Sequence, residues 1–142
     1  MIAKHVKFGI LLSIVLSSVI NASSQTVSDN NIDGRYIIVD DFSKLFTEDE
    51  NQMSNQSLFI YNIYEDESSK PLHIAVNEIN NVIDFSIKSN SENFENQRKC
   101  SIILKKEAYK ETFRTALLSM KVKYVFLMGE KLTINEFYTK IK

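Results

Sequence analysis

Apolar and polar residues alternate along most of the chain, and this pattern predicts a protein built mainly from short β-strands. Strand composition is strongest at Leu58–Tyr64, and Val82–Lys88 alternates so that Ile83, Phe85 and Ile87 would share one buried face. The other predicted strands are Tyr36–Val39, Leu72–Val76, Ser101–Leu104, Lys121–Met128 and Leu132–Ile141. Polar segments at 40–57, 65–71 and 89–99 separate these strands as predicted loops.

One segment has the period of a helix instead of a strand. Between Glu107 and Met120 the apolar residues recur on one helical face, namely Tyr109, Phe113, Ala116, Leu117 and Met120. In the strand that follows, Val122, Tyr124, Phe126 and Met128 are expected on one side. The predicted fold is therefore mostly β with one helix (α+β), a small antiparallel barrel of OB type with the helix before the last two strands.

The N-terminus has the pattern of a cleavable secretory signal. Lys4 and Lys7 precede an apolar stretch of about a dozen residues, which is shorter than the roughly 20 that a membrane-spanning helix needs. Ala22 and Ser24 supply the small residues of a cleavage site. Residues 1–24 are thus predicted to be a signal peptide, and 25–142 a single globular domain that begins with a loose leader at 25–31. The mature protein is expected to be secreted or periplasmic, with no transmembrane segment.

Charge is unevenly distributed along the chain, although the formal net charge is only −1. Residues 29–67 carry ten acidic and two basic side chains, whereas residues 98–142 carry eleven basic and four acidic ones. We expect the two halves to neutralise each other within one fold. The alternative is a head-to-tail ring in which the acidic half of one subunit meets the basic half of the next. The acidic net charge and the export signal argue against nucleic acid as a partner.

Residues with catalytic or cofactor-binding chemistry are scarce. Cys100 is the only cysteine, which excludes an internal disulfide, and it opens an apolar run typical of a buried residue. His73 would be the only histidine after signal removal, and it lies in a predicted strand. The chain has three glycines in total, too few for a phosphate-binding loop. We therefore expect a protein that is not an enzyme and holds no cofactor.

One spacing of oxygen ligands is compatible with calcium. The candidate ligands are Asp29, Asn31, Asp33 and Asp40, which follow a calcium-loop pattern with Gly34 at the turn. However, the twelfth position is Asp40 and not a bidentate Glu. Other acidic runs, such as Glu48-Asp49-Glu50, are interpreted as solvated turns.

The segment Tyr109–Gly129 resembles the helix-plus-strand unit of bacterial AB5 toxin B subunits. It has a helix with an Ala/Leu-rich end that leads into a strand patterned basic, apolar, apolar. The resemblance covers roughly the last 40 residues, and signal peptide and mature length agree with it. It implies a pentameric ring that binds cell-surface glycans, with helices lining a central pore. The chain departs from these families in having one cysteine, no Trp, and Phe126-Leu127 where some members carry a sugar-contacting Tyr-Lys pair.

Two classes of function agree with these observations. The first is an exported, non-enzymatic binding module of the B-subunit type that forms homo-oligomers and binds glycans. The second is an exported inhibitor or immunity protein that blocks an enzyme by protein–protein contact, for example through Glu48-Asp49-Glu50. The residues expected to contact a ligand or a neighbouring subunit are Lys110, Glu111, Arg114 and Phe126.

Overall fold

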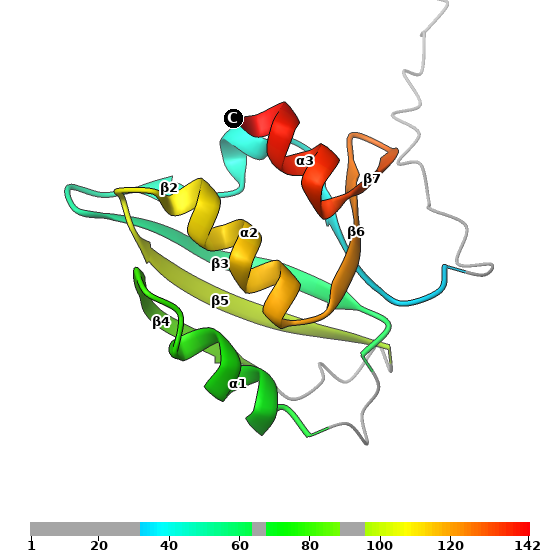
Figure 1. The fold of residues 1–142 in the computed structure, drawn as a ribbon, viewed down its shortest axis with the longest axis horizontal. Helices are drawn as coiled ribbons and strands as arrows, with labels where there is room; N and C mark the ends of the chain where they lie inside the picture. Colours follow the sequence, from blue (N-terminus) through cyan, green and yellow to red (C-terminus); the bar gives the residue numbers. More distant parts are fainter. Residues whose placement is uncertain (1–31, 64–67, 89–95) are drawn as a thin grey trace, which may run out of the picture.

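In the computed structural model, which describes residues 32–63, 68–88 and 96–142, the first strand occupies the middle of an open sheet (Figure 1). β1 (Arg35–Val39) pairs antiparallel with β3 (Gln52–Tyr61) and parallel with β6 (Val122–Leu127). The remaining strands are β2 (Thr47–Glu48), β4 (Val82–Ile87), β5 (Gln97–Lys105) and β7 (Glu130–Thr133). Their order is β4-β5-β3-β1-β6-β7, with β2 beside β3.

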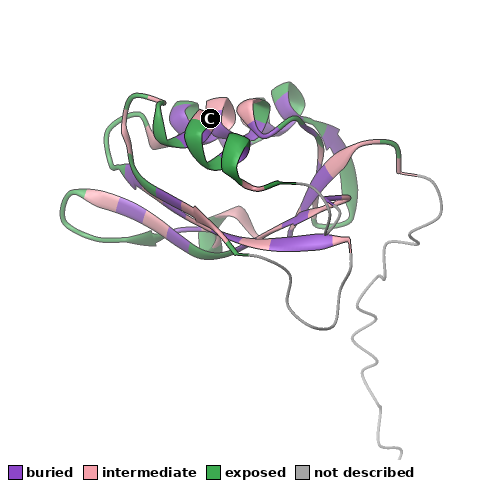
Figure 2. Cartoon of the chain, turned by 90° about the horizontal axis from the view of Figure 1, so that it is seen from below, coloured by how far each residue is buried: buried purple, intermediate pink, exposed green. Residues whose placement is uncertain are grey.

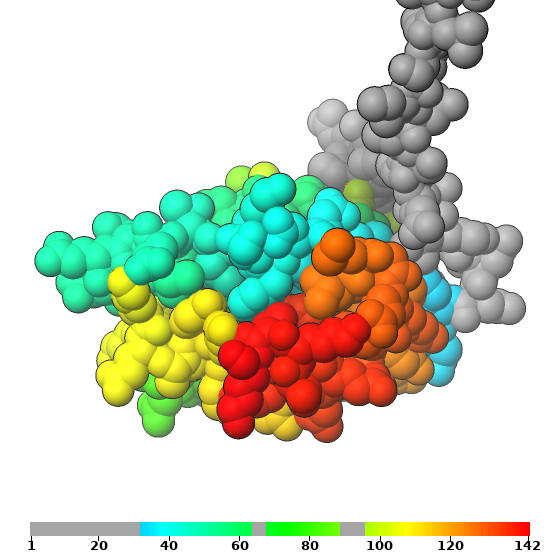
Figure 3. Space-filling model, turned by 90° about the horizontal axis from the view of Figure 1, so that it is seen from above, coloured from blue at the N-terminus to red at the C-terminus, as the bar shows by residue number. Residues whose placement is uncertain are grey.

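Helices α1 (Lys70–Asn77), α2 (Tyr109–Ser119) and α3 (Ile134–Ile141) cover one face of this sheet (Figure 2). A single 3₁₀ turn, η1 (Phe42–Lys44), follows β1. The core lies between the sheet and the helices, and its most deeply buried large side chains include Ile37, Ile60, Phe85, Ile102, Phe113, Leu117 and Phe137. In the space-filling view from above, α3 (red) lies between α2 and the strands β6 and β7 (orange) (Figure 3).

The predicted α+β class is confirmed in its coarse form only. More of the described residues lie in strands than in helices, and α2 matches the predicted helix, but the sheet also contains the parallel pair β1–β6. Its edge strands β4 and β7 are not paired with each other, so the described residues form an open sheet and not a closed OB-type barrel. Within these same residues, no helix is both long enough and apolar enough to cross a membrane.

Two segments predicted as strands are helices. In α1, Leu72 and Val76 are buried four residues apart, and Pro71 stands in the first turn, where a missing N–H costs nothing. Proline therefore begins a helix here and does not interrupt a strand ladder. Short apolar runs do not separate these two structures by period alone.

The C-terminal helix α3 has its own start signal. Thr133 and Glu136 form a capping box, in which each side chain bonds the other's backbone N–H. Hydrogen bonds to Thr133 also hold the pKa of Glu136 below its usual value. Three apolar residues of α3, Ile134, Phe137 and Ile141, then face the core at helical spacing. Of the predicted strand Leu132–Ile141, only Leu132 and Thr133 therefore lie in a strand, at the end of β7.

Irregular strand pairing changes which side chains face the helices. An extra residue at Ile83 in β4 shifts the register between Val82 and Asp84, so Val82 packs against the core while Ile83 is 49% exposed. The same happens at Lys123 in β6. The predictions that Ile83 is buried, and that Val122, Tyr124, Phe126 and Met128 share one side, are therefore wrong.

Asn77 at the end of α1 closes part of the edge of β4. Its side-chain amide donates to the carbonyl oxygen of Phe85 over 3.1 Å, and its Oδ1 accepts the Phe85 N–H over 3.0 Å. One side chain thus satisfies both outward backbone groups of an edge residue, as a paired strand would. It also ties α1 to the sheet.

We predict that Asn77→Ala lowers the free energy of unfolding by about 1 to 3 kcal/mol, because both Phe85 groups lose their partner. Asn77→Asp keeps the acceptor and should lie in between. Urea unfolding measures the effect, and Asn80→Ala in the following exposed turn is the control. Equal midpoints for Asn77→Ala and Asn80→Ala would contradict the edge-closing role.

A second prediction concerns the helix-packed core. Phe113 is fully buried, with Phe46 edge-on at 5.0 Å between ring centroids, so Phe113→Ala should destabilise the domain by about 3 to 5 kcal/mol. Its neighbour Arg114 is partly exposed and bonds only surface groups, so Arg114→Ala should cost about 1 kcal/mol. Urea midpoints of the two variants compare the faces directly.

Candidate functional site

The face of the sheet opposite α1, α2 and α3 carries a row of tyrosines across three adjacent strands. Within the described residues no helix covers this face, and we call it the helix-free face. Tyr36 of β1 is in register with Tyr61 of β3 and with Tyr124 of β6. The rings of Tyr36 and Tyr61 stack at 4.9 Å, and Phe126 meets Tyr36 edge-on at 5.3 Å. Tyr36 and Phe126 are buried although they lie outside the helix-packed core, so this face has an apolar centre of its own.

Beside this row, strands β3, β4 and β5 form a shallow polar depression of about 230 Å³, which we call the sheet-face hollow. Its polar lining comes from Gln56, Asp84, Ser86, Lys88, Lys99 and Ser101. Ser86 and Ser101 are paired across β4 and β5, and the Ser101 hydroxyl donates to Gln56 Oε1 over 2.8 Å. The irregularity in β3 between Asn55 and Leu58 accounts for the position of Gln56.

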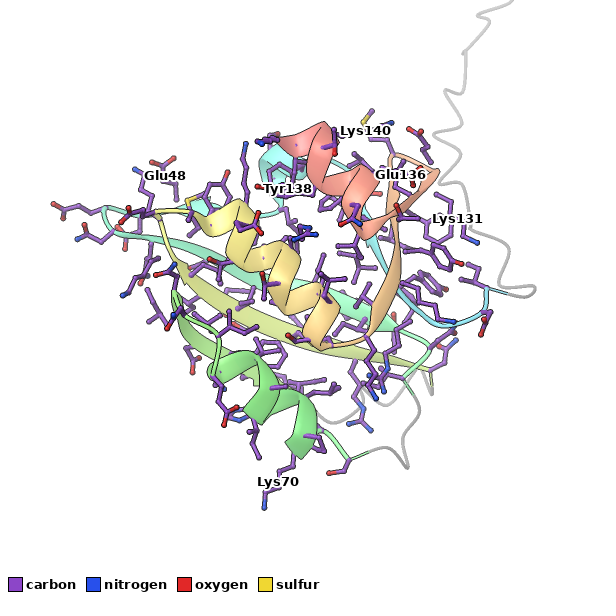
Figure 4. All side chains as sticks on the ribbon, viewed as in Figure 1. Glu48, Lys70, Lys131, Glu136, Tyr138 and Lys140 are labelled. Carbon is purple, nitrogen blue, oxygen red and sulfur yellow. The ribbon has the colours of Figure 1, made fainter. Side chains whose placement is uncertain are left out.

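An aromatic ring adjoins the hollow. Phe59 of β3 is in register with Lys99 of β5, and Lys99 Nζ lies 5.9 Å from the Phe59 ring centroid. The same combination recurs at the other edge of the sheet, where Lys131 Nζ is 3.9 Å from the Tyr124 ring (Lys131 is labelled in Figure 4). The lining of the hollow therefore combines hydrogen-bonding side chains with two ammonium groups, and the Phe59 ring lies next to it beneath Lys99.

This arrangement is suited to binding. A ligand with several hydroxyl groups would find both donors and acceptors at Gln56, Ser86 and Ser101. Ser86 and Ser101 are fixed by the pairing of β4 with β5, and Gln56 is held by its bond to Ser101. Among the described residues, no group of three or more His, Cys, Asp and Glu side chains is placed to hold a metal ion. His73 lies exposed on α1 and not in a strand.

A wider open depression, of about 680 Å³, lies at the end of β1 beside Asn55 and Ser57 of β3. Asp40, Asp41, Asn55 and Met128 contribute to its walls. Asp41 already caps η1, since its Oδ1 accepts the Ser43 N–H at 2.9 Å and the Ser43 hydroxyl at 2.7 Å, and these bonds lower its pKa. The Asp41 carboxylate is thus already bonded within the turn. For this reason we favour the sheet-face hollow as the candidate site.

The four residues expected to contact a ligand or a neighbouring subunit lie on two different faces of the sheet. Lys110 Nζ donates to the carbonyl of Ile141, while Arg114 bonds Glu111 at 3.2 Å and Asn135 at 2.8 Å. These contacts turn that side of α2 towards α3, and Phe126 lies on the opposite face of the sheet.

Tyr138 completes this contact between α2 and α3 (Figure 4). The Arg114 guanidinium lies 5.5 Å from the Tyr138 ring, and a hydrogen bond to Glu111 raises the tyrosine pKa. The helix face predicted to meet a pore or a neighbouring subunit therefore meets α3 of the same chain.

The calcium pattern is also separated by the fold. Asp33 forms an ion pair with Lys123 at 3.0 Å before β1 begins, and Asp40 follows the end of β1. Seven residues of nearly extended chain place the two about 20 Å apart. Asp29 and Asn31 lie outside the described residues, as do the predicted signal peptide and leader.

The uneven charge along the chain is partly neutralised within the fold, as expected. Lys123 with Asp33 and Lys106 with Glu48 each join the basic C-terminal half to the acidic N-terminal half. Glu48 is the last residue of β2 (labelled in Figure 4), and the exposed residues Asp49 and Glu50 follow it in the turn to β3.

Comparison of the chain with protein-family models, with curated proteins and with solved structures gave no match to any of them. The hollow and its lining consist of residues that lie apart in the sequence, and no local motif marks them. The resemblance to toxin B subunits remains a prediction from the sequence.

Cys100, although it lies in the strand beneath the hollow, has its side chain in the core. Burial raises the pKa of the thiol to about 12, against a smaller opposing effect of the Arg98 charge. At pH 8 the thiol is therefore protonated and shielded from solvent.

We predict that the Cys100 thiol of the folded protein does not react with a thiol-specific disulfide reagent over minutes at pH 8, and that it reacts completely in urea. Rapid reaction without urea would contradict the burial of Cys100.

Proposed function

We propose that this chain is an exported, non-enzymatic binding module that holds a glycan against the helix-free face of its sheet. The observation that carries the proposal is the sheet-face hollow, where Gln56, Ser86 and Ser101 present hydrogen-bonding groups beside the ring of Phe59. Sugars offer hydroxyl groups to such side chains and C–H faces to aromatic rings, so the two kinds of surface serve one ligand.

The signal-like N-terminus supports an exported protein, and the sheet supports a preformed site. Ser86, Ser101 and Phe59 belong to strands whose backbones are paired along the hollow, so little conformational entropy would be lost on binding. Self-association into a ring, which the toxin resemblance implies, would have to use surfaces other than the side of α2 that packs on α3.

A second function is favoured by the shape of the β2–β3 turn. This turn projects beyond the sheet (Figures 1 and 3) and carries Asp49 and Glu50, directly after Glu48 at the end of β2. A protruding acidic turn is suited to entering a basic cleft of an enzyme, as an exported inhibitor would.

We predict that the purified protein binds sugars on a glycan array and that Gln56→Ala weakens the binding by at least about fivefold, a loss of roughly 1 kcal/mol for one hydrogen-bonding partner. Gln52→Ala, on the same strand but outside the hollow, is the matched control and should bind as the unchanged protein does. Titration calorimetry with the best array ligand gives the affinities. A protein that binds no sugar would overturn the glycan proposal and leave the inhibitor hypothesis ahead.

A further inference from the structure

We infer that the sheet-face hollow selects a sugar residue that bears an anionic group, which Lys88 and Lys99 would bind. The inference rests on the proposed glycan-binding function and adds the chemical class of the ligand. Its basis is a pair of neighbouring ammonium side chains at one end of a hollow otherwise lined by hydroxyl and amide groups.

Strand pairing brings the two lysines together. Lys88 directly follows β4, and its backbone N–H donates to the carbonyl oxygen of Lys99 on β5 over 2.9 Å. Both side chains line the hollow, Lys88 exposed and Lys99 half-buried over Phe59. Two cations on adjacent residues of a sheet repel each other, and an anion between them would remove that repulsion.

Neither lysine is neutralised within residues 32–63, 68–88 and 96–142. Several other lysines in these ranges have a carboxylate partner, namely Lys44, Lys106, Lys123 and Lys140. No ion pair of this kind joins Lys88 or Lys99 to a described acidic residue. Their charge is therefore available to a ligand.

The acidic residue in the hollow lies at its other end. Asp84 is four strand residues from Lys88, which corresponds to about 13 Å along β4. Exposed charges at this separation are screened at physiological ionic strength, where the screening length is about 8 Å. One end of the hollow is thus cationic, at the two lysines. At the other end, the Asp84 carboxylate can accept hydrogen bonds from sugar hydroxyl groups.

Between these ends lie the groups that would hold the sugar itself. Ser86 and Ser101 form a cross-strand pair in the middle of the hollow, and Gln56 is bonded to Ser101. The volume of about 230 Å³ is below the roughly 300 Å³ at which sites for drug-sized ligands begin. One sugar residue would enter the hollow, and the rest of a chain would lie along the open face.

The test compares three oligosaccharides with one backbone, which carry no charge, a carboxylate or a sulfate ester. Titration calorimetry at low and at physiological salt should give about tenfold tighter binding for one or both anionic forms, as expected for a charge-assisted bond in a partly exposed site. The comparison of carboxylate with sulfate identifies the group. A Lys88→Gln, Lys99→Gln double variant should bind the anionic and neutral forms equally.

Lys105→Gln is the control, because Lys105 is an exposed lysine of the same strand β5 that lies outside the hollow. It should keep the preference for the anionic form. Equal affinity of the unchanged protein for neutral and anionic forms would overturn this inference and leave glycan binding intact, whereas no binding to any form would overturn the proposed function. Lys105→Gln could also lose the preference for the anionic form to the same extent as the double variant. That result would show that the preference comes from the overall charge of the protein, and it would also overturn the inference.

Discussion

The start of β1 is the point on which the sheet depends, because four separate segments are fastened there. Asn62, just after β3, donates to the carbonyls of Ile32 and Gly34 at 2.8 and 3.0 Å, and Arg35 donates to the carbonyl of Met120 at the end of α2. Gly34 has φ +94°, and a Cβ there would lie 2.4 Å from Cδ of Lys123. A glycine lets Lys123 cross the backbone and reach Asp33.

From this point, three irregularities in strand pairing decide which side chains enter which face. Each adds one residue to one strand: in β3 both Gln56 and Ser57 lie opposite Ser101, and the extra residues in β4 and β6 are Ile83 and Lys123. Side chains three positions apart then share a face. The core keeps one continuous cluster on the helix side, and the extra residues supply Gln56 to the hollow and Lys123 to the ion pair.

The sequence predicted the elements whose period is long or whose composition is strong, such as β1, β4, α2 and β6. Of β3 it predicted only the end, from Leu58, because the polar residues 52–57 had been assigned to a loop. It missed α1 and α3 because each is eight residues long, which is two turns and too short to distinguish from a strand by apolar spacing alone. Signals for both were present, in Pro71 at the first turn and in the Thr133–Glu136 capping box. A bulge leaves no comparable signal, so the faces of β4 and β6 could not be assigned.

The hollow escaped prediction for a related reason. Gln56, Ser86 and Lys99 meet only because β5 lies between β3 and β4, an order set by long-range pairing and not by any local spacing. Arg114 was predicted as a contact residue because it lies on the polar face of a clearly amphipathic helix. In the structure it bonds Asn135 of α3, a helix that the sequence analysis had not predicted. Even when a helix is predicted correctly, its exposed face depends on which other elements pack against it. A functional surface can therefore be located only when the packing of all the elements is known. Among the elements that the structure describes, this packing places all three α-helices on one face of the sheet, and the polar side chains gathered on the other face are held by the same strand pairs that build the core.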